Sequence, residues 1–365
     1  MKNKLSIGII GTRGIPNEYG GYEAVVQELG PRLASRGHNV VVYCSSAQVS
    51  RLNSWKNVKL IYNYDPESWM GSSGQFVYDL LSNFSSRRLK HDVIFHMGYT
   101  SDSVWQWIWD RKAVHLTNMD GLEWKRTKYS KRARKFLGFA EKLATNNSDA
   151  LIADNNGIEN YLLQKYNTPV INISYGVDIP DNFTNIGLES YNLTNNGYDL
   201  VIARMVPENN IETIIKAKIS SFQDTPLVIF GNSTKYREYL IEQYSENSKI
   251  FFHNGDFDKT TIDSLRHFAR YYIHGHSVGG TNPSLLEAMA AGSKIIAHDN
   301  EFNRSVLGTG GQYFINDEQL STYFNSPDLV IQPEQVDMNF NTIETNHNWE
   351  HICDQYERAA YKYQV

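Results

Sequence analysis

The sequence predicts an α/β protein of two similar domains, each with a parallel sheet covered by helices. Three observations lead to this class. The chain has 365 residues, about the length of two domains. Short apolar runs alternate with helix-like segments along most of the chain, and one polar, aperiodic stretch at 181–197 interrupts them. Hydrophobic residues make up 41% of the chain, so each half contains enough apolar side chains for its own core.

The first half begins with a strand, a glycine-containing loop, a helix and a second strand, which together form a βαβ unit. Residues 4–10 form a short, mostly apolar run that is followed by Gly11, and apolar residues recur at helical spacing over 23–36. A second strand follows at 39–44. Further strands of this half are predicted at 58–62, 92–96, 114–117, 150–153 and 170–173.

The second half repeats the pattern after the polar stretch. Its strands are predicted at 200–203, 227–230, 249–253, 271–273 and 294–297. We therefore expect a first domain at 1–180, a linker at 181–197 and a second domain at 198–346. The closing helix at about 347–365 is expected to pack back on the first domain. A cleft between such domains would bind ligands beyond the carboxyl ends of the strands.

Composition excludes several classes of protein. The net charge of −5 argues against nucleic-acid binding. The two cysteines, Cys44 and Cys353, fit no metal-binding spacing and are typical of a cytoplasmic protein. No run of eighteen apolar residues occurs, so we expect no membrane span.

The loop at 11–23 is the first candidate binding element. Glycines, including Gly20 and Gly21, let the backbone approach a ligand, and the following helix offers unpaired N–H groups. The spacing of Gly8, Gly11 and Gly14 differs from the dinucleotide fingerprint Gly-x-Gly-x-x-Gly. A plain turn between strand and helix fits the same residues, so both interpretations stay open.

A stronger candidate lies at 279–287. Gly279 and Gly280 precede a helix that Thr281 or Asn282 can cap, which exposes N–H donors suited to a diphosphate. Glu287 lies one turn into the helix, within reach of ribose hydroxyls. An exposed helical charge is the alternative, but the apolar residues around Glu287 indicate that its carboxylate needs a partner.

Two further strand ends carry polar side chains. Arg204 follows a strand and could bind phosphate oxygens, although an ion pair with Glu208 or Glu212 is the alternative. Asp120 also follows a strand and could contact a hydroxyl or accept a proton, whereas an Asx turn before Gly121 explains it equally well.

Histidines and acids near the second-domain motif are weaker signals. His274 and His276 are candidate phosphate or sugar contacts, or structural histidines. Asp256 and Asp258 form an Asp-x-Asp pair, which we interpret as a loop near a base pocket and not as a metal site.

A basic run occupies 125–135. It contains seven Lys or Arg residues in a protein that is acidic overall. A solvated helix face is one explanation, and contact with anionic lipid headgroups or a lipid-diphosphate acceptor is the other.

Together these motifs resemble glycosyltransferase family 4, whose members have the GT-B fold of two facing Rossmann-like domains and retain anomeric configuration. The resemblance spans nearly the whole chain and is similar in detail to bacterial polysaccharide rhamnosyltransferases. The segments that carry it are Gly-Thr-Arg-Gly-Ile-Pro at 11–16, Tyr-Gly-Gly-Tyr-Glu at 19–23, Asp-Gly-Leu-Glu-Trp-Lys-Arg at 120–126, Tyr-Gly-Val-Asp at 175–178 and His-Ser-Val-Gly-Gly-Thr-Asn-Pro at 276–283.

The resemblance implies a metal-independent transferase with no permanently bound cofactor. Its donor would be a nucleoside diphosphate sugar, with dTDP-L-rhamnose favoured, and its acceptor a saccharide or lipid-linked saccharide in cell-surface polysaccharide synthesis. The implied catalytic residues are Asp120, Arg204 and Glu287. The implied donor-binding residues are Gly20, Gly21, Asn209, His276, Gly280, Thr281 and Asn282. The enzyme would work in the cytoplasm, at the inner face of the membrane.

The sequence departs from the family pattern at three positions. Gly279 stands where the family has the first of two glutamates, and Asn209 stands where it has a lysine. Asp120 corresponds by its place after a strand to the family's histidine. These departures leave open a catalytically impaired nucleotide-sugar-binding partner or scaffold and an epimerase on the same fold. A nicotinamide-dependent oxidoreductase is weakened by the glycine spacing.

Overall fold

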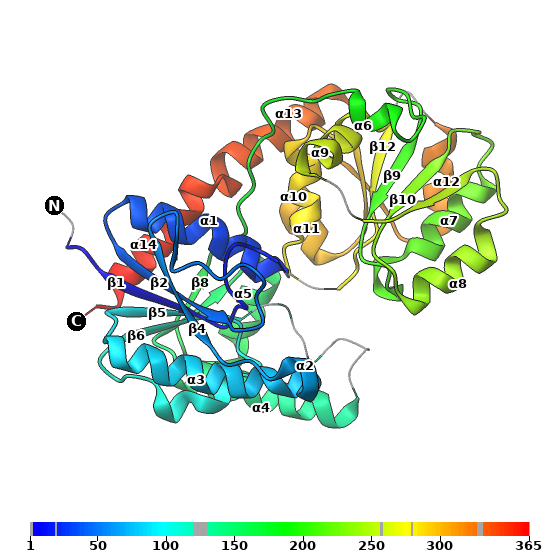
Figure 1. The fold of residues 1–365 in the computed structure, drawn as a ribbon. Coiled ribbons are helices and arrows are strands. Elements are labelled where there is room, and N and C mark those ends of the chain that lie inside the picture. Colours follow the sequence, from blue (N-terminus) through cyan, green and yellow to red (C-terminus); the bar gives the residue numbers. More distant parts are fainter. Residues whose placement is uncertain are drawn as a thin grey trace. The chain divides into compact units, whose positions relative to one another are not determined.

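A computed structural model describes residues 3–18, 20–119, 121, 124, 130–255, 258–278, 280–326 and 331–364 (Figure 1). The chain divides into two compact units. One contains Met1–Tyr175 with Trp349–Val365, and the other contains Gly176–Asn348. Each unit has a largely parallel sheet with helices on its faces, so the predicted α/β class is confirmed.

The described residues of the first unit form an eight-stranded sheet in the order β3-β4-β2-β1-β5-β6-β7-β8. Every neighbouring pair is parallel except the short pair β3–β4. Its strands are β1 (Ser6–Ile10), β2 (Asn39–Ser45), β3 (Ser54–Trp55), β4 (Val58–Asn63), β5 (Val93–Met97), β6 (Val114–Asn118), β7 (Ala150–Ala153) and β8 (Val170–Asn172). The inner strands β5, β6 and β7 are buried at every position, as expected when helices cover both faces of a parallel sheet.

The helices of this unit include one from the far end of the chain. They are α1 (Gly21–Ser35), α2 (Glu67–Met70), α3 (Gly74–Leu89), α4 (Lys131–Asn147), α5 (Asn156–Lys165) and α14 (Trp349–Lys362), with the 3₁₀ turns η1 (Gly71–Ser73) and η2 (Ser103–Ile108). Helix α14 packs against α1, and Ile352 and Tyr356 join the core of the sheet. Arg36, just after α1, binds Asp354 at 2.6 Å and Glu357 at 3.2 Å.

The described residues of the second unit form a six-stranded parallel sheet in the order β11-β10-β9-β12-β13-β14. The strands are β9 (Asp199–Ile202), β10 (Leu227–Phe230), β11 (Ile250–His253), β12 (Tyr271–His274), β13 (Ile295–His298) and β14 (Gln312–Phe314). The helices are α6 (Ile186–Glu189), α7 (Ile211–Ser220), α8 (Lys235–Tyr244), α9 (Lys259–Phe268), α10 (Pro283–Ala290), α11 (Glu301–Leu307), α12 (Asp317–Asn325) and α13 (Pro333–Thr342), with the turns η4 (Pro207–Asn209) and η5 (Ile343–His347).

The polar stretch at 181–197 belongs to the second unit, which begins earlier, at Gly176. Leu188 is buried, and the ring of Phe183 stacks on His267 with 3.8 Å between ring centroids. The backbone N–H of Thr184 donates to Ser264 Oγ at 3.0 Å. A few isolated apolar side chains therefore attach this segment to the second unit, although its polarity and lack of period had indicated a linker.

A buried charge cluster anchors the start of the central strand β9. The carboxylate of Asp199 is fully buried and accepts hydrogen bonds from Lys218 Nζ at 2.8 Å and from Arg270 Nε and Nη2 at 2.8 and 2.6 Å. Burial is the main cause of the lowered pKa of Lys218, which Asp199 partly offsets. The aspartate thus holds two cations that could not be buried without it.

Replacing Asp199 with Asn should strongly destabilise the second unit, because Lys218 and Arg270 would lose the charge that compensates their burial. We expect a loss of about 3–5 kcal/mol in the free energy of unfolding, measured by urea denaturation. The matched control is Asp299→Asn, which breaks the exposed pair with Arg304 and should cost at most about 1 kcal/mol. Equal losses in both variants would contradict the anchoring role.

Candidate functional site

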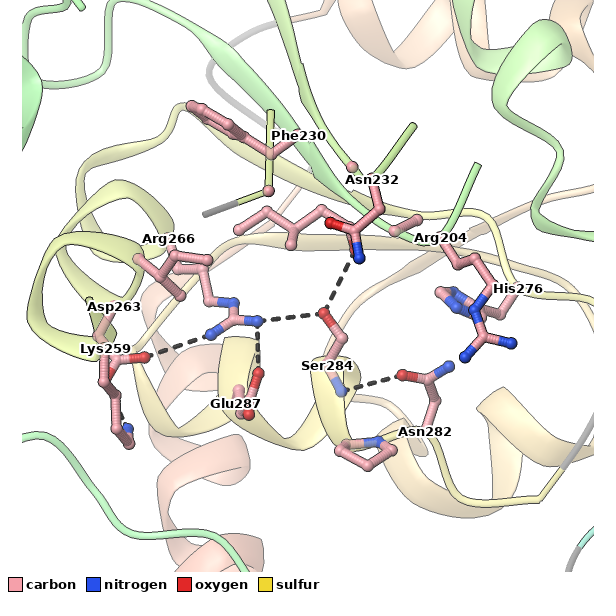
Figure 2. A pocket seen from close by; sticks show the side chains of 16 residues that line it. Arg204, Phe230, Asn232, Lys259, Asp263, Arg266, His276, Asn282, Ser284 and Glu287 are labelled. Atoms are coloured by element: carbon pink, nitrogen blue, oxygen red, sulfur yellow. Dashed lines mark hydrogen bonds and ion pairs between the residues drawn. The ribbon is translucent and has the colours of Figure 1, made fainter. Parts of the chain in front are cut away.

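A pocket of about 520 Å³ opens at the carboxyl ends of the strands of the second unit (Figure 2). It is where ligands bind in open parallel sheets, because loops from several strand ends meet there. Figure 2 shows Arg204, His276 and Asn282 on one side and Lys259, Asp263 and Arg266 on the other. The lining residues are Ile202, Ala203, Arg204, Phe230, Gly231, Asn232, Gly255, Lys259, Ile262, Asp263, Arg266, His276, Asn282, Pro283, Ser284 and Glu287.

Arg204 brings a cation to the pocket, and among the described residues its side chain has no ion-pair partner. It follows β9, and its exposed side chain lies beside His276 and Asn282. The ion pairs with Glu208 or Glu212 that would have explained it are not formed in the described part of the chain. Glu212 instead binds Lys216 at 3.0 Å. The guanidinium is therefore available to an anionic ligand.

Asn209 forms a hydrogen bond with the backbone of Arg204. Its buried side chain donates from Nδ2 to the backbone carbonyl of Arg204 at 2.7 Å, and it does not line the pocket. The backbone at Asn209 also lies against Gly275, where an added Cβ would be 2.1 Å from the Asn209 carbonyl oxygen. Only glycine permits this close approach, which joins the loops after β9 and β12.

The amino terminus of α10 faces the pocket. Asn282, one of the two caps that the sequence allowed, caps the helix by accepting a hydrogen bond from the backbone N–H of Ser284 at 2.9 Å. Pro283 occupies the first turn, while Leu285, Leu286 and their apolar neighbours bury the opposite face. The positive end of the helix dipole therefore lies next to Arg204 and favours an anion there.

The carboxylate of Glu287 has a charged partner, as the apolar residues around it in the sequence had indicated. Arg266 on α9 donates from Nη2 to Glu287 Oε2 at 2.5 Å. Arg266 is itself buried, and it also donates to Asp263 Oδ1 and Ser284 Oγ, each at 3.2 Å. The side chain of Glu287 is 36% exposed and lines the pocket, so its carboxylate is held in place and still reachable.

The rings of His274 and His276 stack on each other, and His276 lies beside Arg204 (Figure 2). The rings of His274 and His276 lie 4.4 Å apart at 15°. His274 Nδ1 and Nε2 and His276 Nδ1 are buried without a hydrogen-bond partner among the described residues. Burial, followed by the neighbouring Arg204, lowers the pKa of His276 to about 4, and burial lowers that of His274 well below its usual range. Both rings are therefore neutral at physiological pH.

The remaining predicted site residues lie elsewhere. Gly280 and Thr281 precede α10 but do not line the pocket. Gly20 and Gly21 stand at the start of α1 in the first unit. The structure does not describe Asp120, Gly279, Asp256 and Phe257.

The glycine loop of the first unit carries its own cation. The backbone N–H of Arg13 donates to Glu23 Oε1 at 2.8 Å, and its side chain pairs with Glu67 of α2. Gly14 adopts φ of +110° against Cys44, a conformation that requires glycine. The loop is thus tightly packed around Arg13, a residue to which the sequence assigned no role.

Sequence reasoning also missed the α9 side of the pocket. Arg266 and Lys259 lie on α9, and Asn232 follows β10. One signal existed for Arg266: it is a charged residue next to the apolar positions Ile262, Leu265 and Ala269 at helical spacing. No sequence signal indicated that its partner would be Glu287, which lies 21 residues later in the chain, because tertiary packing determines which helices form ion pairs.

Within the described ranges, no group of three or more His, Cys, Asp or Glu side chains is arranged to hold a metal ion. Asp258, the described member of the Asp-x-Asp pair, caps α9 by accepting from the Thr261 backbone N–H at 3.0 Å. Its carboxylate thus has a structural partner.

Comparison with known families divides the chain much as the structure does. Residues 192–326 match the family described as glycosyl transferases group 1. Residues 4–178 match a domain of unknown function, DUF1972. No curated protein matches the sequence.

Solved structures resemble the whole chain. Sucrose-phosphate synthase from Thermosynechococcus elongatus is 18% identical, with a TM-score of 0.83 over 98% of this chain and 99% of that one. HepE of Anabaena, solved with UDP and glucose, is 14% identical, with a TM-score of 0.78 over 98% and 100%. The catalytic domain of starch synthase IV from Arabidopsis thaliana, bound to ADP and acarbose, is 14% identical, with a TM-score of 0.73 over 99% of both chains.

These likenesses confirm the expected GT-B fold. The second unit carries a glycosyl transferases group 1 domain, and its pocket lies within the matched residues. The chain is therefore a transferase enzyme.

The neutral histidines make stability depend on pH. The unfolded chain protonates a histidine near pH 6.5, whereas folded His276 protonates only near pH 4. Between these values the unfolded state binds more protons, so stability should fall as pH falls from 6.5 towards 4. Between pH 7 and pH 5, the free energy of unfolding of the His276→Asn variant, measured by urea denaturation, should therefore fall by roughly 2 kcal/mol less than that of the wild type. An unchanged pH dependence in this variant would show that His276 is not held neutral.

Proposed function

We propose that this enzyme transfers a sugar from a nucleoside diphosphate donor bound in the second-unit pocket. The observation that carries the proposal is the guanidinium of Arg204, which forms no ion pair within the described part of the chain and lies beside the amino terminus of α10. A cation and a helix dipole directed at one point form a site for a diphosphate. Negative charge grows on this diphosphate as the sugar leaves, so both groups would stabilise the transition state more than the ground state.

The other pocket groups fit the same ligand. Glu287 can accept a ribose hydroxyl, and neutral His276 can donate to a phosphate oxygen or a sugar hydroxyl without adding charge. Asn209 would act indirectly, by fixing the backbone of Arg204. UDP in the similar HepE and ADP in the similar starch synthase support a nucleoside diphosphate as leaving group.

The first unit would supply the acceptor side. Asp120 would lie near the acceptor, and Gly20 and Gly21 would belong to a loop that closes over the diphosphate. The favoured donor would be dTDP-L-rhamnose, and the acceptor would be a saccharide or lipid-linked saccharide that is built into a cell-surface polysaccharide. Sequence resemblance supports these finer assignments.

A nucleotide-sugar-binding partner without full activity is the second candidate. It is favoured by Asn209, which leaves Arg204 without the lysine of the related pattern and is itself turned towards the backbone. The two candidates differ in one observable: the partner would bind the donor tightly and not consume it, with or without acceptors.

Arg204→Ala should weaken both binding and turnover. Loss of a preorganised charged donor at the leaving group typically lowers turnover by about 10²-fold. The wild type can be tested with dTDP, UDP, GDP, CDP and NAD. The nucleoside diphosphate that it binds should raise its melting temperature, because a ligand at a hundred times its Kd stabilises the folded state by about 2.7 kcal/mol.

Lys216→Ala is the matched control, because Lys216 is an exposed cation that binds Glu212 outside the pocket. It should leave binding and turnover unchanged. A wild-type shift with NAD alone, or full activity in Arg204→Ala, would contradict the proposed donor site.

We also propose that α4 rests on an anionic membrane surface. The described part of the basic run, 131–135, begins α4, and Phe136 and Phe139 on the same helix are 37% and 55% exposed. Trp107 of η2, which packs on α4, is 61% exposed. Exposed aromatic rings among cations are typical of segments lying at a lipid interface. None of the described helices is long and apolar enough to cross a bilayer.

The double substitution Lys131→Glu with Arg132→Glu should weaken binding to vesicles that contain phosphatidylglycerol, measured by flotation. Each basic residue near the surface contributes about 1 kcal/mol, so the loss of two cations alone should reduce the partition coefficient roughly thirtyfold, and the two added negative charges should reduce it further. Phe139→Ser should weaken binding further. Phe222→Ser, an 89% exposed ring in the second unit, is the control. Equal binding to neutral and anionic vesicles would overturn the assignment.

A further inference from the structure

Two histidines and an aspartate of the first unit form a buried chain of hydrogen bonds that the proposed reaction does not use. His96 of β5 lies between Asp102, which precedes η2, and His115 of β6. Its Nδ1 is 2.5 Å from Asp102 Oδ2, and its Nε2 is 2.9 Å from His115 Nδ1. His115 Nε2 lies 2.9 Å from the backbone carbonyl oxygen of Asp110. The three side chains are almost completely buried, so we expect every one of these contacts to be a true hydrogen bond.

The number of protons in this chain follows from the number of its bonds. Each of the three contacts needs one proton between its two heavy atoms, because two bare lone pairs at these distances would repel each other. A neutral imidazole carries a single N–H, and neither an ionised carboxylate nor a carbonyl oxygen can donate. Two neutral rings therefore supply two protons, and the chain holds one more.

The position of the extra proton follows from the surroundings of each group. Burial, together with the neighbouring His96, lowers the pKa of His115 to about 4, so His115 does not hold it. Asp102 Oδ1 accepts a hydrogen bond from Asn83 Nδ2 of α3 at 2.5 Å, which leaves Oδ2 for His96. The extra proton therefore lies between His96 Nδ1 and Asp102 Oδ2. With it the pair carries no net charge, as the burial of both groups favours.

The other titratable groups around the pair leave it to balance its own charge, as far as the described residues show. Asp79 of α3 is fully buried. Burial, followed by the neighbouring Asp102, raises the pKa of Asp79 well above its usual range and favours its neutral form, and Arg13 opposes this shift only weakly. Asp110 offers its backbone carbonyl to the chain. Trp109 stacks on both imidazole rings, with centroids 4.1 and 4.8 Å away.

We infer that His96 and Asp102 share one buried proton near neutral pH, and that this proton fixes the loop after β5 and the start of η2 against the sheet. The inference is independent of the proposed function. Asp102 caps the start of η2, and Ser101 just before it donates to Asp79 Oδ2 at 2.5 Å. Asn83 connects Asp102 to α3. Without the shared proton, one bond of this connection between two helical elements and the sheet would be lost.

The direct test is the protonation state of the ring nitrogens, read from long-range ¹H–¹⁵N NMR spectra of the full chain near neutral pH. The variants His96→Asn and His115→Asn assign the signals. We expect a protonated Nε2 on both rings, a bare Nδ1 on His115, and a strongly deshielded proton in the bond to Asp102. A bare Nε2 on His96, or a doubly protonated His115, would overturn the inference.

Asp102→Asn supplies a second readout, because an amide can donate to His96 Nδ1 without the extra proton and can still accept from Asn83. The deshielded signal should vanish, and the unfolding equilibrium constant, measured in urea, should rise by no more than about tenfold. Asp102→Leu is the matched control. It leaves Asn83 and His96 without this partner, so it should raise the same constant by about a hundredfold or more.

Equal losses of stability in the two variants would contradict the shared proton, since the amide of Asp102→Asn would then meet an N–H on His96. The wild-type spectra decide the inference if neither variant folds.

Discussion

The second unit depends on the central strand β9, which has a buried charge cluster at one end and the pocket at the other. Asp199 begins the strand and holds two cations in the core. Two residues beyond its last residue, Ile202, Arg204 enters the pocket. Because the strand between them is only four residues long and buried between parallel neighbours, the position of Arg204 follows from that of Asp199.

The polar groups of the pocket fall into two sets with different tasks. On one side, Arg266 of α9 and Glu287 of α10 pair with each other, so they form a wall of fixed geometry with little net charge. On the other side, Arg204 and the amino terminus of α10 supply positive charge that no described carboxylate neutralises. A ligand with a diphosphate and an attached ribose has the matching distribution of charge, and the site would be prepared for it before binding.

Much of this could be predicted from the sequence, and the reason is local. Strand periodicity, the Asn282 cap and the apolar face of α10 depend on neighbours in the chain, so the α/β class and the motif at 279–287 follow from spacing. Arg266 could not be assigned, because its bond to Glu287 joins two helices through tertiary packing. The stretch at 181–197 misled for a related reason, since Phe183 and Leu188 are single anchors without a period.

The most direct test of this account is hydrogen–deuterium exchange of the full chain with and without saturating nucleoside diphosphate. We expect slower exchange in the backbone around Arg204 and at the start of α10, because the ligand would bind those N–H groups and restrain the loops that carry them. Protection confined to the glycine loop of the first unit, with none around the pocket, would contradict the assignment of the donor site to the second unit.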